Sequence, residues 1–252
     1  RQTGENAQYA LRLQRNNTET GTSAMAIATA LETSDIVPLR GTKVTVSFRM
    51  RKGANYSGGD VSVNLFTGTA TESIRDFTAG YTGEANIGGT IASATISTSF
   101  VDYSITSSAV VASNATQMTL GIQYSPTGTA GANDWIEVEQ IQLEEGSVAT
   151  PFEHRSYGTE LALCQRYYEK FDVGTIVTTT SGQSYGAVGS YKVEKRAVAS
   201  ITLVLSVGTH GFPGTLGTSY TNTVNAINYY LGATATQHGS AFTHTLAASA
   251  EL

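Results

Sequence analysis

Two acidic residues, Glu137 and Glu139, are the feature of this sequence that comes nearest to a catalytic arrangement. If residues 135–143 form a β-strand, both side chains lie on one face, with their carboxylates roughly 6 to 7 Å apart. This separation is near the lower end of the range found in inverting glycosidases, which points to polysaccharide hydrolysis. Adjacent acids on an exposed strand are, however, usually a solvated face, and no other feature indicates a cleft or a raised pKa. We therefore expect that the protein is not an enzyme.

The same region also offers oxygen ligands for a metal ion. Carboxylates are ligands that calcium prefers, and the candidates are Asp134, Glu137 and Glu139. No dense acidic loop accompanies them, so a structural calcium is the alternative to a protein without any cofactor. The histidines do not have a metal-binding spacing. Cys164 has no neighbouring signature of thiol catalysis, so we expect it to be a small buried apolar residue.

Sugar binding makes fewer demands, because it needs planar rings for the faces of the sugar and a few fixed polar groups for its hydroxyls. The outward-facing candidates in the first part of the chain are Arg49, Tyr56, Asn64, Phe66 and Gln123. A segment near the end is rich in Tyr and Asn, as adaptable binding surfaces are. Its candidates are His210, Tyr220, Asn228, Tyr229 and Tyr230. Each candidate in the first part of the chain is, taken singly, more often an ordinary outer-face residue, and we prefer the C-terminal segment as the receptor-facing region.

The composition predicts that strands position these side chains. Among 252 residues only 14% are charged, 26 are glycine, and Ser and Thr are frequent, which disfavours helices and suits exposed sheet faces. The net charge of −5 comes without a basic block, so we expect neither nucleic acid nor a membrane surface as a partner. The most apolar run, residues 197–207, is shorter than the ~20 residues that cross a bilayer. Since no signal-peptide pattern follows Arg1, we expect a piece of a longer protein.

Alternation at period two predicts a β-sandwich over residues 9–143. The inward-facing sets are Val44, Val46, Phe48 and Met50; Val61, Val63 and Leu65; Val101, Tyr103 and Ile105; and Met118, Leu120, Ile122 and Tyr124. Turn-prone segments separate them. Within residues 135–143 the inward parity changes, because Ile136 and Val138 share one phase and Ile141 and Leu143 the other. We therefore predict a β-bulge near Glu139 and Gln140.

One helix is predicted over residues 159–171, after Pro151 ends the sheet pattern. Thr159 is a suitable N-cap. A single apolar stripe follows at helical spacing, formed by Leu161, Cys164, Tyr168 and Phe171. A helix about 20 Å long is not stable alone in water, so we expect three copies to pack these stripes around one axis. The predicted organisation is a jelly-roll domain over residues 1–155, a connecting helix over 156–172 and a smaller β domain over 173–252.

Residues 135–170 resemble the junction found in many phage and prophage tail-fibre proteins. A last jelly-roll strand is followed by the pattern G-S-x-A-T-P-F-E-x-R at residues 146–155 and by E-L-x-x-C-Q-R-Y-Y at residues 160–168. The segment Tyr-Ala-Leu-Arg-Leu-Gln at 9–14 and residues 39–50 are similar to early strands of a jelly roll like that of carbohydrate-binding modules. The terminal Ala-Ser-Ala-Glu-Leu also resembles the end of such fibres. The resemblance therefore covers most of the chain, and it is most specific at the junction.

This resemblance implies a non-enzymatic virion protein of the phage tail. Such a protein attaches the phage to host cell-surface polysaccharide, usually as a homotrimer beside other tail proteins, and its jelly roll often holds a structural calcium. Two alternatives stay open: a polysaccharide-degrading tailspike that uses Glu137 and Glu139, and a purely structural tail module without a ligand. The resemblance does not transfer a binding site, because Trp135 is the only tryptophan and the usual stacking row is missing.

Overall fold

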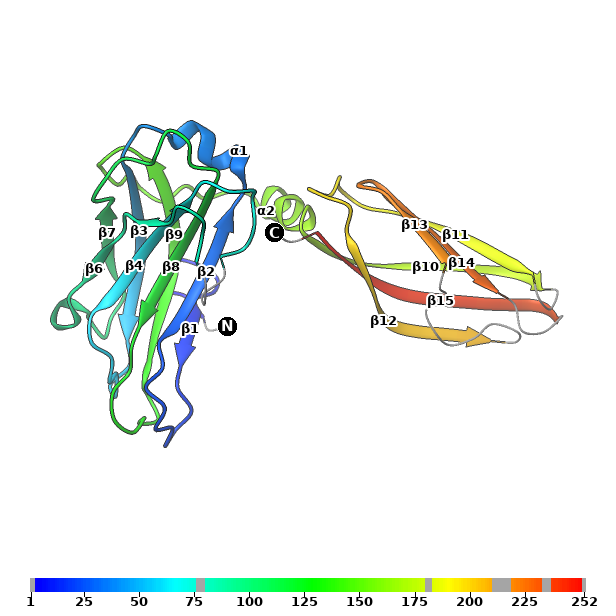
Figure 1. The fold of residues 1–252 in the computed structure, drawn as a ribbon. Coiled ribbons are helices and arrows are strands. Elements are labelled where there is room, and N and C mark those ends of the chain that lie inside the picture. The colour runs from blue at the N-terminus through cyan, green and yellow to red at the C-terminus, as the bar shows by residue number, and fades with distance from the viewer. Residues whose placement is uncertain (1–2, 76–79, 180–182, 210–218, 233–236, 251–252) are drawn as a thin grey trace. The chain divides into compact units, whose positions relative to one another are not determined.

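The computed structural model describes residues 3–75, 80–179, 183–209, 219–232 and 237–250 (Figure 1). The chain forms two compact units, unit 1 over Arg1–Glu153 and unit 2 over His154–Glu251. Both consist of antiparallel sheets, which confirms the all-β prediction. Helices in the described part are short: α1 (Thr33–Ile36), α2 (Tyr157–Gln165) and the 3-10 turns η1 (Val37–Leu39) and η2 (Ser93–Thr95). None of these helices is long and apolar enough to cross a membrane.

Unit 1 is a sandwich of two antiparallel sheets. One sheet has the order β1-β9-β3-β7, and its strands are β1 (Leu11–Gln14), β9 (Trp135–Glu145), β3 (Val44–Lys52) and β7 (Val101–Thr106). The other has the order β2-β8-β4-β5, with β6 also beside β4. Its strands are β2 (Met25–Leu31), β8 (Gln117–Tyr124), β4 (Val61–Gly68), β5 (Ala85–Asn86) and β6 (Gly89–Ile91).

The core between the sheets contains the predicted inward-facing residues of β3, β4 and β8, all of them buried. One predicted inward residue, Val101, is 42% exposed. It begins β7, which is an edge strand that pairs only with β3, so the core does not extend over it. Further along β7, Tyr103 still stacks on Phe48 with ring centroids 6.1 Å apart. The alternation therefore predicts which side chains of β3, β4 and β8 face the core, but not the exposure of Val101 at this corner.

The β-bulge predicted near Glu139 and Gln140 is confirmed. Ser47 lies opposite Gln142 and Arg49 opposite Glu139, so β9 uses one residue more than β3 over this stretch. Gln140 takes up the difference with a φ of 52°, in the left-handed region. As a result, the apolar residues of β9 on both sides of the bulge face the core.

The predicted helix over residues 159–171 is wrong in its second half. α2 ends at Gln165, and its N-cap is Ser156, whose Oγ accepts the Thr159 N–H at 3.3 Å. The chain then enters β10 (Tyr168–Thr179), in which Tyr168 pairs with Ser249 and Phe171 with Leu246. This backbone pairing with a distant strand outweighs the local helical spacing.

The predicted trimer seam is therefore absent from the structure. Of its four members, Leu161 and Cys164 are exposed on α2, and Tyr168 and Phe171 belong to β10. Cys164 is not the buried residue that its position on the stripe predicted. A helical surface of these residues cannot hold three copies together.

Unit 2 contains two three-stranded sheets of order β10-β15-β12 and β11-β14-β13. The remaining strands are β11 (Ser184–Ser190), β12 (Ser200–Thr209), β13 (Ser219–Asn222), β14 (Ala226–Gly232) and β15 (Gln237–Ser249). A small apolar cluster forms around Tyr191, against which Phe171 packs edge-on with ring centroids 5.3 Å apart. Polar groups are buried as well: Lys195 pairs with Glu169 at 2.9 Å, and His244 is fully buried on β15.

Acidification is expected to destabilise unit 2 through His244. Burial lowers the pKa of His244 below its ordinary value of 6.5, because the charged imidazolium is desolvated. The unfolded chain thus binds a proton at a higher pH than the folded chain. The free energy of unfolding is therefore at its full value above the pKa of the unfolded chain and decreases as the pH falls towards the lowered pKa of the folded chain. Urea unfolding followed by the amide NMR signals of β15 should have a lower midpoint at about pH 5 than at about pH 7.5.

His244→Gln should reduce this pH dependence, whereas His154→Gln, which changes an exposed histidine of the same unit, should not. An equal pH dependence in the wild type and in His244→Gln would contradict the assignment.

Candidate functional site

The predicted acid pair Glu137 and Glu139 lies on one face of β9, but it is not a solvated pair. The two residues are 0% and 3% exposed. Glu137 accepts hydrogen bonds from Arg12 Nε at 2.7 Å and Arg51 Nε at 2.6 Å. Glu139 accepts one from Arg49 Nη1 at 2.8 Å, and the backbone N–H groups of the N-terminal segment donate two more. The expectation of a solvated acidic face is therefore wrong.

Aromatic rings complete this arrangement, which we call the arginine lattice and which consists of Arg12, Arg49, Arg51, Glu137 and Glu139. The guanidinium of Arg12 lies 4.5 Å from the ring centroid of Trp135, and that of Arg51 lies 4.6 Å from the centroid of Phe100. Such cation–π contacts hold the guanidinium planes in place. Both carboxylates that glycoside hydrolysis would require are thus bound by arginines.

The third predicted calcium ligand, Asp134, belongs to a different cluster. Its carboxylate accepts hydrogen bonds from Arg15 Nη1 at 3.1 Å and from the Ser57 N–H at 2.9 Å. The guanidinium of Arg15 is also surrounded by backbone carbonyl oxygens, those of Glu19, Gly21, Thr127 and Gly128. In the described part of the chain, no cluster of His, Cys, Asp or Glu is arranged to hold a metal. Asp134, Glu137 and Glu139 therefore do not form the predicted calcium site.

Among the predicted sugar-binding residues of unit 1, Asn64, Phe66 and Gln123 share the outer face of β4 and β8. Asn64 Nδ2 donates to Gln123 Oε1 at 3.4 Å, but Asn64 is only 8% exposed. The guanidinium of Arg75 lies 3.7 Å from the ring centroid of Phe66. This part of the face is therefore occupied by the protein's own side chains.

Tyr56 is directed into unit 1 and does not stand on an outer face. Its ring packs on Tyr124 with centroids 5.1 Å apart, and its hydroxyl donates to the carbonyl of Gly59 at 2.8 Å. Burial raises the pKa of the Tyr56 hydroxyl. The ring supports the packing of a loop and offers no platform for a sugar.

The predicted C-terminal region is only partly described. His210 lies outside the described residues. Tyr220 is on β13, and Asn228, Tyr229 and Tyr230 are on β14, where Tyr220 pairs with Tyr229. Asn228 is half-buried, and the side chains of the three tyrosines lie outside the described part.

The remaining candidate, Arg49, lines a pocket of 390 Å³ on the outer face of the β1-β9-β3-β7 sheet. Residues 149–152 form one wall of this pocket, and we call them the strap. We call the cavity the strap pocket. Its polar lining comes from Ser47 and Arg49 on β3, Asp102 and Ser104 on β7, and Gln140 on β9. Phe152 of the strap adds an aromatic ring. Gln140, the residue at the bulge, is one of the lining residues, so the bulge contributes to this pocket.

Hydrogen bonds fasten the strap to the second half of β9. The Thr150 N–H donates to Glu144 Oε2 at 3.1 Å, and the Thr150 hydroxyl donates to the other carboxylate oxygen. Gln142 accepts the Glu153 N–H at 2.8 Å. The Thr150 hydroxyl and the Gln142 amide stabilise the ionised carboxylate and so lower the pKa of Glu144. Near neutral pH the wall of the pocket is thus held in place.

Inside the strap pocket, a fixed cation lies beside an open carboxylate. The Arg49 side chain is only 12% exposed, and its Nε is 3.4 Å from Asp102 Oδ1, whose side chain is 88% exposed. Gln140 Nε2 donates to the carbonyl of Asn6 at 3.2 Å, which orients its amide. Carboxylate, amide, hydroxyls and one ring are the groups that a sugar requires. The sequence indicated only Arg49 of this set.

No protein-family model matches this sequence. No curated protein matches it either. Among solved structures, the chain is similar to one described as the structure of the tripod (BppUct-A-L) from the baseplate of bacteriophage Tuc2009, with a TM-score of 0.31 and 11% sequence identity. The likeness covers 85% of this chain and 82% of that chain. A TM-score of 0.31 does not establish a common fold.

Replacing Glu137 by Gln should destabilise unit 1 by about 2 to 3 kcal/mol, because Arg12 and Arg51 then face a neutral amide in a buried position. Urea unfolding followed by the fluorescence of Trp135 measures this change, since Trp135 touches the lattice and is the only tryptophan. Glu145→Gln, at the exposed end of β9, is the matched control and should shift stability by less than about 0.5 kcal/mol. Similar stability of the two variants would mean that the lattice does not support unit 1.

Proposed function

We propose that this chain is a non-enzymatic attachment protein of a bacteriophage tail, and that unit 1 binds a sugar of the host surface polysaccharide in the strap pocket. The observation that carries the proposal is the pocket itself. Its wall is built by residues 149–152, which lie inside the segment 146–155 that resembles the junction of tail-fibre proteins. The most specific part of the resemblance thus includes residues of the pocket whose side chains best suit a sugar in unit 1.

The size and chemistry of the strap pocket support a small polar ligand. Its 390 Å³ lies within the range of about 300 to 1,000 Å³ that is typical of small-molecule sites. Asp102 can accept hydrogen bonds from a pair of sugar hydroxyls, while Ser47, Ser104 and Gln140 can both donate and accept. The ring of Phe152 suits the apolar face of a pyranose. Because Arg49 is held by Glu139, the polar groups are placed before a ligand arrives.

The lining also favours binding over hydrolysis. Asp102 is the only carboxylate among the residues that line the strap pocket. Most glycosidases need two carboxylates on either side of the scissile bond. The pair that the tailspike alternative requires, Glu137 and Glu139, is held by arginines. Attachment without cleavage is the simpler function for this geometry.

Binding to a glycan array and to host cells tests the proposal. Asp102→Ala and Phe152→Ala should each weaken glycan binding about tenfold or more, because one removes the open acceptor and the other the stacking surface. Asp35→Asn is the matched control, since Asp35 is an exposed acid of unit 1 outside the pocket. Circular dichroism should show that all three variants fold.

The outcomes separate the alternatives. Wild-type affinity in both pocket variants would overturn the site, even if the protein binds glycans. The absence of any glycan or cell binding would overturn attachment and leave a structural tail module. Release of reducing ends from host polysaccharide would instead establish the tailspike alternative.

Assembly as a homotrimer stays a prediction from the resemblance. The helical stripe that was expected to join the three copies does not support it, because its residues are divided between α2 and β10. Light scattering at micromolar concentration should give three times the chain mass of 26.5 kDa. Leu161→Asp should leave that mass unchanged, because Leu161 is an exposed residue of a helix that provides no continuous apolar stripe. A wild-type mass of one chain contradicts the trimer, and a loss of assembly in Leu161→Asp contradicts the revised role of α2.

A further inference from the structure

The charges of the strap pocket narrow the kind of sugar that it can accept. Only two of the residues that line it are charged, Arg49 and Asp102. The Nη1 of Arg49 lies 2.8 Å from Oε1 of Glu139, whose side chain is 0% exposed. A buried carboxylate needs a cationic partner, so the charge of Arg49 is neutralised by the protein itself. The charge of Asp102, whose side chain is 88% exposed, therefore faces the ligand.

A further acid adds to this excess of negative charge. Glu5 Oε2 lies 3.1 Å from Nη2 of Arg49, and Asp102 Oδ1 lies 3.4 Å from its Nε. Besides Arg49, the donors to Glu139 are the backbone N–H groups of Glu5 and Asn6, which carry no formal charge. One guanidinium therefore serves three carboxylates.

The N–H donors of Arg49 are also used within the protein. Nη1 donates to Glu139 at 2.8 Å, and Nη2 donates to Glu5 at 3.1 Å and to the carbonyl of Phe100 at 3.3 Å. The guanidinium lies 5.6 Å from the ring centroid of Phe100. An acidic sugar would therefore meet no cation in the lining whose charge is unmatched, and Asp102 would repel it. The pocket favours a neutral or a cationic ligand.

We propose that the strap pocket selects a sugar unit that carries a primary ammonium group. Such a group has three N–H donors and a positive charge. Asp102 supplies the opposite charge, and the hydroxyls of Ser47 and Ser104 in the same lining supply neutral acceptors. A sugar hydroxyl in the same place would form hydrogen bonds without the Coulomb attraction, so the charge discriminates between the two. The selection of an ammonium sugar rests on the proposed function, because the same pocket must be the glycan site.

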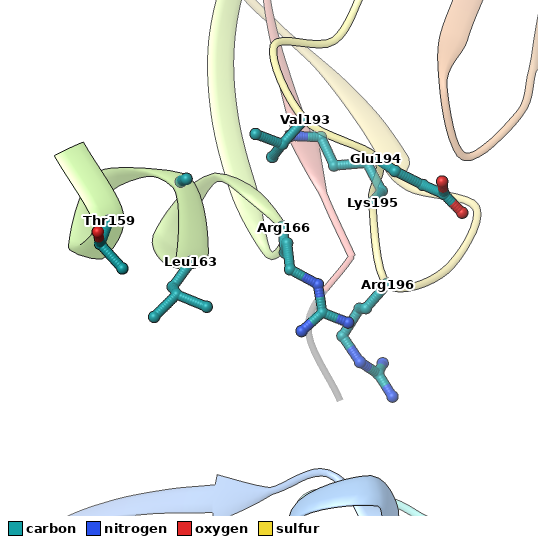
Figure 2. Close-up of a pocket in the computed structure, with 8 residues that line it drawn as sticks. Thr159, Leu163, Arg166, Val193, Glu194, Lys195 and Arg196 are labelled. Atoms are coloured by element: carbon teal, nitrogen blue, oxygen red, sulfur yellow. The ribbon is translucent and has the colours of Figure 1, made fainter.

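Unit 2 offers an internal reference for this selection. Its pocket of 640 Å³ lies between α2 and the segment that follows β11 (Figure 2). The lining has one acid, Glu194, and three basic residues, Arg166, Lys195 and Arg196. Since this lining has no excess of acid, an ammonium ligand is not expected to prefer it. The backbone amide signals of residues 193–196 therefore report non-specific binding.

The test is an NMR titration of the full chain that follows the backbone amide signals of residues 102–104. The ammonium probes are methyl glucosaminide, with the charge on the ring, and 2-aminoethyl glucoside, with the charge on a substituent. Methyl glucoside is the neutral probe and methyl glucuronide the anionic one. At least one ammonium probe should bind about tenfold more tightly than methyl glucoside, and this preference should fall as salt is raised. The tighter ammonium probe identifies where the host sugar carries its charge.

Three results of this titration overturn the proposal. The first is equal affinity for the ammonium probes and methyl glucoside, and the second is tighter binding of methyl glucuronide. The third is the absence of saturable shifts at residues 102–104 with every probe, or equal shifts there and at residues 193–196.

Asp102→Asn separates charge from shape, because it keeps the size of the side chain and a carbonyl acceptor but removes the negative charge. The tenfold preference for the ammonium probe over methyl glucoside should disappear in this variant. Glu145→Gln is the matched control, since it makes the same change of net charge at the exposed end of β9, outside the lining. Its preference should equal that of the wild type. A preference that survives in Asp102→Asn, or falls equally in both variants, overturns the assignment.

The proposed function and the selection of an ammonium sugar can fail separately. If neutral and ammonium sugars bind equally well in the strap pocket and host cells are bound, attachment stands and the selection falls. If an ammonium probe is preferred through Asp102 while no host glycan or cell is bound, the selection stands and attachment falls.

Discussion

The burial of Glu137 and Glu139 on β9 is the constraint on which the rest of unit 1 depends. A charge without water requires hydrogen-bonded partners, and here the partners come from the strands on both sides of β9. Arg12 of β1 and Arg51 of β3 meet at Glu137, while Arg49 of β3 and the N-terminal segment meet at Glu139. The pairing therefore fixes the neighbours of β9 and its register around the bulge. In the neighbouring β3–β7 pairing Arg49 lies opposite Asp102, so Arg49 links the lattice to the strap pocket.

Where one face of a strand is buried, its residue pattern was sufficient to predict structure. The inward residues of β3, β4 and β8 were predicted correctly, and so was the bulge, because a change of parity in β9 has no other simple cause. The same pattern could not show what covers the outer face. The sequence predicts a solvated Glu137, because nothing near Glu137 in the chain indicates that Arg12, 125 positions away, is its partner. The alternation of apolar and polar residues shows which side chains of a strand face outward, but the partners of these side chains follow only from the fold.

Non-local pairing also explains the failed half of the helix and the missed site. The spacing of the apolar residues from Leu161 to Phe171 suits a helix. Tyr168 and Phe171 nevertheless belong to β10, which pairs along its length with β15 near the end of the chain. The strap pocket draws Asp102, Gln140 and Phe152 from separate segments, and none of them is unusual in its own neighbourhood. The segment 146–155, which carries the resemblance to tail-fibre junctions, does lie at the strap pocket. Its sequence indicates a junction, and in the structure its residues 149–152 also form a wall of the strap pocket.

The oxygen-lined cluster around Arg15 has a consequence for where unit 1 can work. The positive charge at its centre is covalently part of the chain, held by the carboxylate of Asp134 and by loop carbonyls. A dissociable ion in such a place would leave whenever its concentration fell, and the loops would change with the medium. With a guanidinium there, the positive charge at this end of the sandwich depends neither on the concentration of free metal ions nor on chelators.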